Sequence, residues 1–288
     1  MLRLGLPKGS LQDATFSLFA KAGWTIRVDA RSYQPIVDDS ELSITLIRPQ
    51  EVARYLEDGI IDAGLTGKDW IEDCGADVYE ICELAYSKAT RNPIRVVLAA
   101  GQNDAVKSVQ DLEGKRIATE YVRLTERYLA ANKVSAKVEF SWGACEVKVP
   151  ALADAIVVNT ETGSSLKAHD LRIIDTLLMS TTRFICHHGA WADPTKRNQM
   201  ENMAMLLSGA LYAGELVGLK MNVSPENLAS VVNQLPALRK PTVSPLYGEA
   251  GFALEIIIEH KMSRDLIPRL KRAGADGIVE YALNKVIH

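Results

Sequence analysis

Short apolar runs alternate with helical patterns along the first part of the chain. The predicted strands are 2–6, 42–47 and 61–65, and the predicted helices are 11–22 and 49–59. Pro49 suits the first position of a helix, because its missing N–H is one that a helix leaves unbonded anyway. A strand–loop–helix order of this kind predicts an α/β fold with a mostly parallel sheet.

A polar stretch around residue 90 interrupts this order, and a second α/β series follows it. The predicted strands are 94–100, 116–119, 137–141 and 154–158, and the predicted helices are 122–131 and one that begins near Gly163. The two series are similar in size, so we predict one lobe at 1–90 and another at 91–179. By periodicity alone, residues 171–186 fit either lobe. We expect residues from about 180 to 212 to complete the first lobe.

The last part of the chain has a different order of elements. A long helix at 194–214 carries apolar side chains at spacings of three and four, which is typical of core or interface packing: Met200, Met203, Leu206, Leu207 and Leu211. The strands predicted after it are 218–223, 242–246, 252–259 and 277–283, with helices at 225–235 and 263–273. This βαββαβ order predicts a ferredoxin-like domain at 213–288.

Composition places the chain among ordinary globular proteins. Of its 288 residues, 47% are hydrophobic and 24% are charged, which excludes a disordered or low-complexity chain. The net charge of -3 argues against a general nucleic-acid binder, and a local phosphate pocket is compatible with it. We see neither a membrane-spanning run nor a signal-peptide pattern, and the cysteines are scattered without metal-ligand spacing: Cys74, Cys82, Cys145 and Cys186. We therefore expect a cytoplasmic protein with reduced thiols.

The segment most informative about chemistry is Thr160-Glu161-Thr162-Gly163-Ser164-Ser165, which joins a strand to a helix. Glycine lets backbone N–H groups approach an anion, and the hydroxyl groups add hydrogen-bond donors. The same residue types also cap helices, so the segment fits either a phosphate site or a cap. Its spacing is not that of a P-loop.

Three cations follow three successive predicted strands: Lys8, Arg48 and Lys68. Ligands of open α/β sheets collect at the carboxyl ends of strands, so the three together suggest a cleft that handles several phosphates. Taken singly, each is more typical of a solvated loop.

Carboxylates and histidines give weaker signals. Glu120 and Glu146 follow strands of the second lobe, where they could bind Mg²⁺ or ribose hydroxyls or simply lie on the surface. We reject His187 and His188 as a metal pair, because adjacent residues on a strand point to opposite faces. No Ser-His-Asp or Cys-His set can be assembled from spacing.

Together these segments resemble the ATP phosphoribosyltransferase family, the first enzyme of histidine biosynthesis, in its long form. Matching segments span the chain: LPKGSL at 6–11, RP at 48–49, GLTGKDWIEDCGADV at 64–78, RNP at 91–93, RIATEYVRLTERYL at 116–129, DAIVVNTETGSSL at 154–166, STTRFI at 180–185, DPTKR at 193–197, PTVSPL at 241–246 and LIPRLKRAGADGIVEYALNKVI at 266–287.

The resemblance implies two type II periplasmic-binding-protein-like lobes with a cleft, and a C-terminal ferredoxin-like domain that senses L-histidine. It also implies a reaction: N1 of ATP attacks C1 of phosphoribosyl pyrophosphate (PRPP) and displaces pyrophosphate, with Mg²⁺ present, to give N1-(5-phosphoribosyl)-ATP. Such chemistry depends on alignment and charge placement, which accounts for the missing nucleophile motif. The resemblance further implies homodimers that assemble into a hexamer.

The resemblance also assigns roles to individual residues. The loop for the 5-phosphate of PRPP matches Glu161, Thr162, Gly163, Ser164 and Ser165, and the family's acid before that loop matches Asp154, which we take as catalytic and as a Mg²⁺ ligand acting mostly through substrate phosphates. Cleft positions of the first lobe match Lys8, Arg48, Gly67, Lys68 and Asp69, of which we take Lys8 and Arg48 as catalytic. Those of the second lobe match Glu120, Tyr121 and Glu146, and the histidine site matches Asn222, Thr242 and Gly277.

The chain departs from the family pattern at four positions. Val158 stands where many relatives have an acid, and Asn159 beside it is also unusual. Ser10 replaces a frequent arginine, and Asn222 stands where some relatives have an aspartate for the ammonium group of histidine. An alternative function is a non-catalytic cytoplasmic protein that binds a nucleotide or phosphosugar in the same cleft. Another phosphoribosyltransferase class fits less well, because those enzymes usually have two adjacent acids before the loop.

Overall fold

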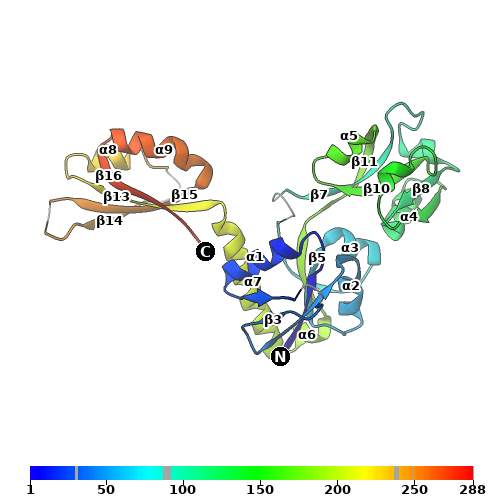
Figure 1. Ribbon diagram of the computed structural model, residues 1–288, viewed down its shortest axis with the longest axis horizontal. Coiled ribbons are helices and arrows are strands. Elements are labelled where there is room, and N and C mark those ends of the chain that lie inside the picture. The colour runs from blue at the N-terminus through cyan, green and yellow to red at the C-terminus, as the bar shows by residue number, and fades with distance from the viewer. Residues whose placement is uncertain (30–31, 87–91, 237–239, 249, 288) are drawn as a thin grey trace. The chain divides into compact units, whose positions relative to one another are not determined.

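The computed structural model describes residues 1–29, 32–86, 92–236, 240–248 and 250–287 (Figure 1). The chain divides into two compact units, Met1–Ala20 with Trp24–Ala204, and Lys21–Gly23 with Met205–His288. The predicted lobe boundary near residue 90 lies outside the described residues, as does Arg91 of the RNP segment. The predicted domain limits therefore stay predictions.

The first lobe of the larger unit contains a five-stranded sheet in the order β4-β1-β5-β12-β6. Its strands are β1 (Leu2–Pro7), β4 (Leu42–Ile47), β5 (Ala63–Gly67), β6 (Tyr79–Leu84) and β12 (Thr182–Cys186). β1 pairs in parallel with β4 and β5, whereas β12 runs antiparallel to β5 and β6. The other elements are α1 (Gln12–Ala22), α2 (Pro49–Glu57), α3 (Lys68–Cys74), α6 (His188–Ala192), α7 (Pro194–Ala213) and the ribbon of β2 (Ile26–Arg27) with β3 (Ile36–Val37).

The second lobe contains another five-stranded sheet, in the order β11-β7-β10-β8-β9. Its strands are β7 (Ile94–Gly101), β8 (Arg116–Thr119), β9 (Lys137–Phe140), β10 (Ala155–Thr160) and β11 (Leu171–Ser180), and its helices are α4 (Val122–Ala131), α5 (Ser164–Ala168) and the 3₁₀ segments Val109–Leu112 and Cys145–Lys148. β11 pairs with β7, and β12 then pairs with β5 in the first lobe. The chain therefore returns to the first lobe between Ser180 and Thr182, and the predicted two-lobed α/β plan is confirmed.

Local sequence explains why cleft residues gather at the carboxyl ends of the first-lobe strands. β1 is buried except at Arg3, as expected of an interior parallel strand covered on both faces. Arg48 is extended, with ψ 135°, because a residue before proline is disfavoured in the helical region. Pro49 then begins α2, so Arg48 lies at the corner where β4 ends.

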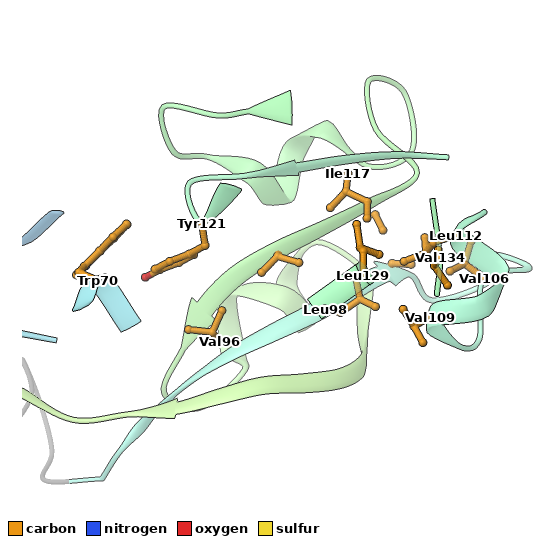
Figure 2. Packing of buried hydrophobic residues seen from close by; sticks show 13 residues of the cluster. Trp70, Val96, Leu98, Val106, Val109, Leu112, Ile117, Tyr121, Leu129 and Val134 are labelled. Carbon is orange, nitrogen blue, oxygen red and sulfur yellow. The ribbon is translucent and has the colours of Figure 1, made fainter. Parts of the chain in front are cut away.

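The core of the second lobe includes an aromatic side chain from the first. Trp70 of α3 belongs to the same buried cluster as Val96, Leu98 and Leu129. Figure 2 shows its ring beside that of Tyr121, and the two are stacked with centroids 4.3 Å apart. Only 8% of Trp70 is exposed to solvent. The two lobes are therefore packed together beside the cleft described below.

The C-terminal unit has the predicted ferredoxin-like order. Its elements are β13 (Leu216–Val223), α8 (Leu228–Val232), β14 (Thr242–Pro245), β15 (Phe252–Glu259), α9 (His260–Arg272) and β16 (Ala275–Ala282). The antiparallel sheet has the order β14-β15-β13-β16, and Figure 1 shows α8 and α9 on one of its faces. The helix predicted at 225–235 is shorter than expected, because turns occupy both ends, as in the bond from Asn227 N–H to the Ser224 carbonyl.

Two further expectations can be compared with the structure. None of the helices in the described ranges is long and apolar enough to cross a membrane. In the stripe on α7, Met200, Met203 and Leu207 are buried, which fits the packing role predicted for them.

Candidate active site

A cleft of about 720 Å³ lies in the larger unit and receives residues from both lobes. First-lobe residues come from the carboxyl ends of β1, β4 and β5, and second-lobe residues from the ends of β8 and β10. The cleft is lined by most of the predicted site residues: Lys8, Arg48, Gly67, Asp69, Glu120, Tyr121, Glu146, Glu161, Thr162, Ser164 and Ser165.

Two cations are available at the first-lobe side of the cleft. The Lys8 ammonium lies 3.6 Å from the centroid of the Tyr33 ring and donates to the Ser32 carbonyl at 3.5 Å. Arg48 is exposed, and its side chain forms no hydrogen bond or ion pair in the described part of the chain. Neither cation is neutralised by a carboxylate there, so both can bind an incoming anion.

The prediction that Lys68 joins these two cations is wrong. Its side chain does not line the cleft. Lys68 is the first residue of α3, and its ammonium lies 2.5 Å from Glu80 on β6 and 3.1 Å from Glu72 one turn along the helix. These two carboxylates neutralise the Lys68 ammonium and hold it toward β6.

The loop at the end of β10 is shaped by its own hydroxyl groups. Thr160 Oγ1 accepts from the Gly163 N–H at 2.9 Å, and Thr162 Oγ1 accepts from the Ser164 N–H at 3.3 Å. Gly163 has φ +78°, a conformation that favours glycine, and it precedes α5 without a side-chain cap. Gly163 itself is not among the lining residues. Thr160 therefore stabilises the loop, and Thr162 binds the first N–H of α5, while Ser165 donates to Glu146 at 2.8 Å.

The predicted placement of Asp154 at the cleft is also wrong. Asp154 immediately precedes β10, whereas the loop follows the last residue of that strand. At about 3.3 Å per residue, the strand separates the two by roughly 20 Å. The Asp154 carboxylate accepts from the Arg116 N–H at 2.8 Å and lies 4.0 Å from the Lys115 ammonium. It joins the starts of two parallel strands, β8 and β10, at the opposite edge of the sheet.

A buried carboxylate forms the floor of the cleft. Asp69 is 1% exposed, and it accepts from Ser180 Oγ at 2.6 Å and from the Tyr121 hydroxyl at 2.7 Å. Burial raises the pKa of the Asp69 carboxyl, and these hydrogen bonds oppose the rise only in part. The Tyr121 hydroxyl in turn accepts from the Asn159 amide at 2.8 Å. These residues come from α3, β11, the start of α4 and β10.

The partners of Tyr121 limit what its hydroxyl can do for a substrate. The side chain is 2% exposed, and burial together with the neighbouring Asp69 charge raises its pKa well above the ordinary value. Its single hydrogen is donated to Asp69, so the phenol cannot also donate to a phosphate. Tyr121 therefore supports the cleft wall and does not act as a proton donor in this arrangement.

Magnesium has few direct protein ligands here. No group of three or more candidate ligand side chains is found among the residues that the structure describes. Glu120, Glu146 and Glu161 line the cleft, but Ser165 already donates to Glu146. Mg²⁺ usually binds through one or two carboxylates plus substrate phosphates and water, and this donor set fits that mode. It does not fit a metal held by the protein alone.

Sequence reasoning missed several functional positions. Ser180 and Trp70 lie within quoted motifs, and Tyr33 contacts Lys8 from a loop without any motif. Asn159 carried a signal, because it was unusual in its run, but its partner could not be read from spacing. Tyr121 lies 38 positions away in the chain, and only the pairing of β8 with β10 brings the two together.

The C-terminal unit contains a second, smaller pocket of about 210 Å³. All three residues predicted for the histidine site line it, namely Asn222, Thr242 and Gly277. Lys220 and Glu255 add one charge of each sign, with 3.6 Å between the ammonium and the carboxylate.

The fold and the main cleft define a two-lobed α/β protein suited to phosphorylated small molecules, and comparison with known proteins identifies its family. The ATP phosphoribosyltransferase profile matches residues 48–209, and that of the HisG C-terminal domain matches residues 213–285. The ATP phosphoribosyltransferase of Chlorobaculum parvum is 56% identical over 287 residues, which cover 100% of this chain and 98% of that protein. The one from Pelotomaculum thermopropionicum is 54% identical over 286 residues, 99% of each chain.

The chain belongs to the ATP phosphoribosyltransferase family, which confirms the predicted family and enzyme class. A solved ATP phosphoribosyl transferase (HisG:HisZ) complex from Thermotoga maritima contains a chain of the same fold, with TM-score 0.62 and 24% identity. The match covers 99% of that chain but only 72% of this one. The alternative of a binding protein without turnover is not favoured.

Proposed function

We propose that this chain transfers the phosphoribosyl group of PRPP to N1 of ATP, the first step of L-histidine biosynthesis. The observation that carries the proposal is the full-length identity with ATP phosphoribosyltransferases, 56% over 287 residues. The cleft supports it, because cations on one wall and a hydroxyl-rich loop on the other suit a substrate with phosphates at both ends.

The reaction makes one bond and breaks one. The N1 lone pair of ATP forms a bond to C1 of the ribose, and the bond from C1 to the pyrophosphate oxygen breaks with its electron pair leaving on pyrophosphate. The loop at 160–165 binds the 5-phosphate through its hydroxyl and amide groups. Lys8 and Arg48 lie free of carboxylate partners in the described chain and stabilise the charge that develops on pyrophosphate.

Magnesium enters this proposal with the substrate. When bound, it neutralises pyrophosphate charge and so makes that group easier to displace. Glu120 is the cleft carboxylate of the second lobe that we assign to the metal's outer coordination, because Ser165 already donates to Glu146. Asp154, at the far edge of the sheet, has no part in it.

The deciding experiment measures pyrophosphate release by the full chain. We expect release only when ATP, PRPP and Mg²⁺ are all present, together with a product that contains the adenine and phosphoribosyl groups in equal amounts. Folded protein that binds PRPP without turnover would instead support the non-catalytic alternative. Omitting each of the three components in turn provides the controls.

We also propose that the smaller pocket binds L-histidine and that binding inhibits the enzyme. A free amino acid carries one ammonium and one carboxylate, and the pocket offers Glu255 and Lys220. Glu255 supplies the negative charge that Asn222 lacks, and Tyr281 donates a hydrogen bond to it. Thr242 and Ser244 add hydroxyl groups for the imidazole.

Inhibition can be tested with one near-isosteric change. Thr242→Val removes a hydroxyl from β14, and we expect inhibition by histidine to weaken about 10-fold if that hydroxyl bonds the ligand. The activity measured without histidine serves as the reference for each protein. Equal inhibition of both proteins would place the histidine site elsewhere.

We further propose an oligomeric state and a compartment for the protein. The family resemblance supports homodimers that form a hexamer in the cytoplasm. Sedimentation of the purified chain with and without histidine tests the assembly directly, since a hexamer and a dimer differ threefold in mass.

A further inference from the structure

Asn159 is a cleft residue to which the reaction as proposed gives no role. It is the fifth residue of β10, directly before the phosphate loop begins at Thr160. Its side chain is exposed toward the cleft, and its amide nitrogen lies 2.8 Å from the Tyr121 hydroxyl. The Asn159 amide therefore donates to a buried group of the cleft floor.

The hydrogen bonds that begin at Asn159 end at Asp69. Asn159 donates to Tyr121, Tyr121 donates to Asp69, and Ser180 donates to the other oxygen of Asp69. Asp69 accepts from both sides and so terminates the chain of donors. Each side chain in the series has one donor facing one acceptor, which an isosteric exchange of amide for carboxylate would disturb.

This series joins segments that supply the two walls of the cleft. Asn159 adjoins the phosphate loop of the second lobe, and Asp69 lies beside Gly67 in the first lobe. Ser180 ends β11, where the chain returns from one lobe to the other. Stacking of Trp70 on Tyr121 fixes the plane of the ring that carries the central hydroxyl. The side chain of Asn159 is thus linked by hydrogen bonds to both walls of the cleft.

We propose that Asn159 is a positioning residue which, through Tyr121 and Asp69, fixes the position of the phosphate loop relative to the first lobe. The inference rests on the proposed transferase function, because the relative position of the two walls matters where two substrates react in line. Misplacement by about 1 Å can cost 100-fold in rate without preventing binding. The effect of breaking the series therefore falls on kcat more than on KM.

The first test is Asn159→Asp, assayed at about pH 8. Two carboxylates then face one phenol hydrogen, so one acceptor loses its donor. We expect kcat, expressed per PRPP-binding site measured by equilibrium dialysis, to fall about 10-fold, in line with one lost hydrogen bond. KM for ATP should change less than about 3-fold. A kcat per binding site equal to that of the unchanged protein would overturn the proposal.

The sharper test is the reciprocal exchange Asp69→Asn with Asn159→Asp. In the double variant, Ser180 donates to the carbonyl oxygen of the new amide at position 69, and the nitrogen of that amide donates to Tyr121. Tyr121 then donates to the carboxylate at position 159. Every donor again faces one acceptor, with the direction reversed. We expect kcat to recover to within about 3-fold of the unchanged protein, although Asn159→Asp alone is impaired.

The double variant also separates positioning from charge repulsion. It retains the new carboxylate beside the phosphate loop, so an effect of that charge on the bound substrates would persist and kcat would stay low. A double variant no better than Asn159→Asp therefore contradicts the proposal. Tyr121→Phe provides an independent route, since it removes the central hydroxyl and keeps the ring; in that background Asn159→Asp should have little further effect.

A matched control is Asn132→Asp in the same lobe. The Asn132 amide donates to the Tyr128 carbonyl at 2.8 Å, outside the cleft, so the exchange removes the same kind of bond. We expect a similar small loss of stability and unchanged kinetic constants. If the unchanged protein itself gives no product, the proposed transferase function is wrong. If the unchanged protein gives product and Asn159→Asp has the same kcat, only the role of Asn159 is wrong.

Discussion

Asp62 and Asp69 lie on either side of strand β5, and both are almost completely buried, yet their surroundings differ. Asp62, before the strand, accepts from Arg3 and from the Lys196 ammonium at 2.9 Å. Burial alone would raise its pKa, but these cationic partners lower the value to about 2. Asp69, beyond the strand, has only neutral hydroxyl and amide partners within the described chain, and burial raises its pKa.

This comparison distinguishes charged groups that stabilise the fold, at the amino ends of the strands, from those that face the cleft, at the carboxyl ends. At the amino ends of the strands, carboxylates bind cations or backbone amides within the protein, as Asp62 does in the first-lobe sheet and Asp154 in the second-lobe sheet. At the carboxyl edge, Asp69 takes neutral donors, and Lys8 and Arg48 are left without carboxylates in the described residues. Cations held by a neighbouring carboxylate would bind phosphate less well, so this arrangement preserves them for substrate.

The largest expected effect is at Arg48. Arg48→Ala should lower kcat/KM for PRPP by about 100-fold to 1,000-fold, because it removes a charge from the site where pyrophosphate charge develops. Its side chain is exposed, so the free energy of unfolding should change by less than about 0.5 kcal/mol. Steady-state kinetics and urea unfolding check the two parts. Lys68→Ala is the comparison, with an expected change below about 3-fold, and an equal loss in both variants would contradict the placement described.

The next effect is on stability, at the amino edge. Asp62→Asn leaves Arg3 and Lys196 facing an uncharged amide, and we expect the free energy of unfolding to fall by about 3 kcal/mol. KM values of the protein that remains folded should stay the same, because Asp62 lies outside the cleft. Urea unfolding at neutral pH measures the loss.

The Asp62 interaction should also depend on acid pH. Its folded pKa of about 2 is below the ordinary 3.8, so the ionised carboxylate stabilises the fold above about pH 4. That contribution, about 2 kcal/mol, should be lost as pH falls from 4 to 2. Between pH 4 and pH 2, the free energy of unfolding should fall more steeply with decreasing pH for the unchanged protein than for Asp62→Asn. Parallel curves would show that Asp62 is not the group responsible.

Asp69→Asn should have the opposite balance. Because burial raises the pKa of Asp69, its ionised form opposes folding at neutral pH, and a neutral amide removes that cost. We expect the free energy of unfolding, measured in urea, to stay within about 1 kcal/mol of the unchanged value or to rise, because turning the Asn159 amide lets Tyr121 donate to its oxygen and every donor keeps an acceptor. If Asp69→Asn destabilised the fold as much as Asp62→Asn does, the contrast between the two edges would be wrong.

The smallest effect is expected at Asp154. Its side chain is 35% exposed, and its main partner is a backbone amide. Asp154→Asn should cost about 1 kcal/mol of stability or less and leave kcat within about 2-fold. A large loss of activity in steady-state assays would restore the catalytic role that the sequence suggested.

Much of the fold could be predicted because apolar periodicity and turn residues act locally. β4, β8 and α4 begin and end at the predicted residues, since each has a clear apolar pattern and a distinct stop. Cleft residues on motif loops were also predictable, as Arg48 and the loop at 160–165 show. Lys68 and Asp154 were misplaced because a charge beside a motif says nothing about its partner. Strand pairing places Glu80 beside Lys68 and Arg116 beside Asp154, and residue spacing along the sequence does not predict that pairing.

The packing of Trp70 into the second-lobe core limits how often the cleft can open wide. Separating the lobes would expose the face of Trp70 that packs against the second lobe, and at about 25 cal/mol per Å² each 100 Å² or so of that face costs roughly 2.5 kcal/mol. A conformer that exposes about 100 Å² of it is populated on the order of once in a hundred molecules. Substrates therefore meet a site whose walls are already assembled, and their binding energy is left for the reaction rather than for closing the lobes.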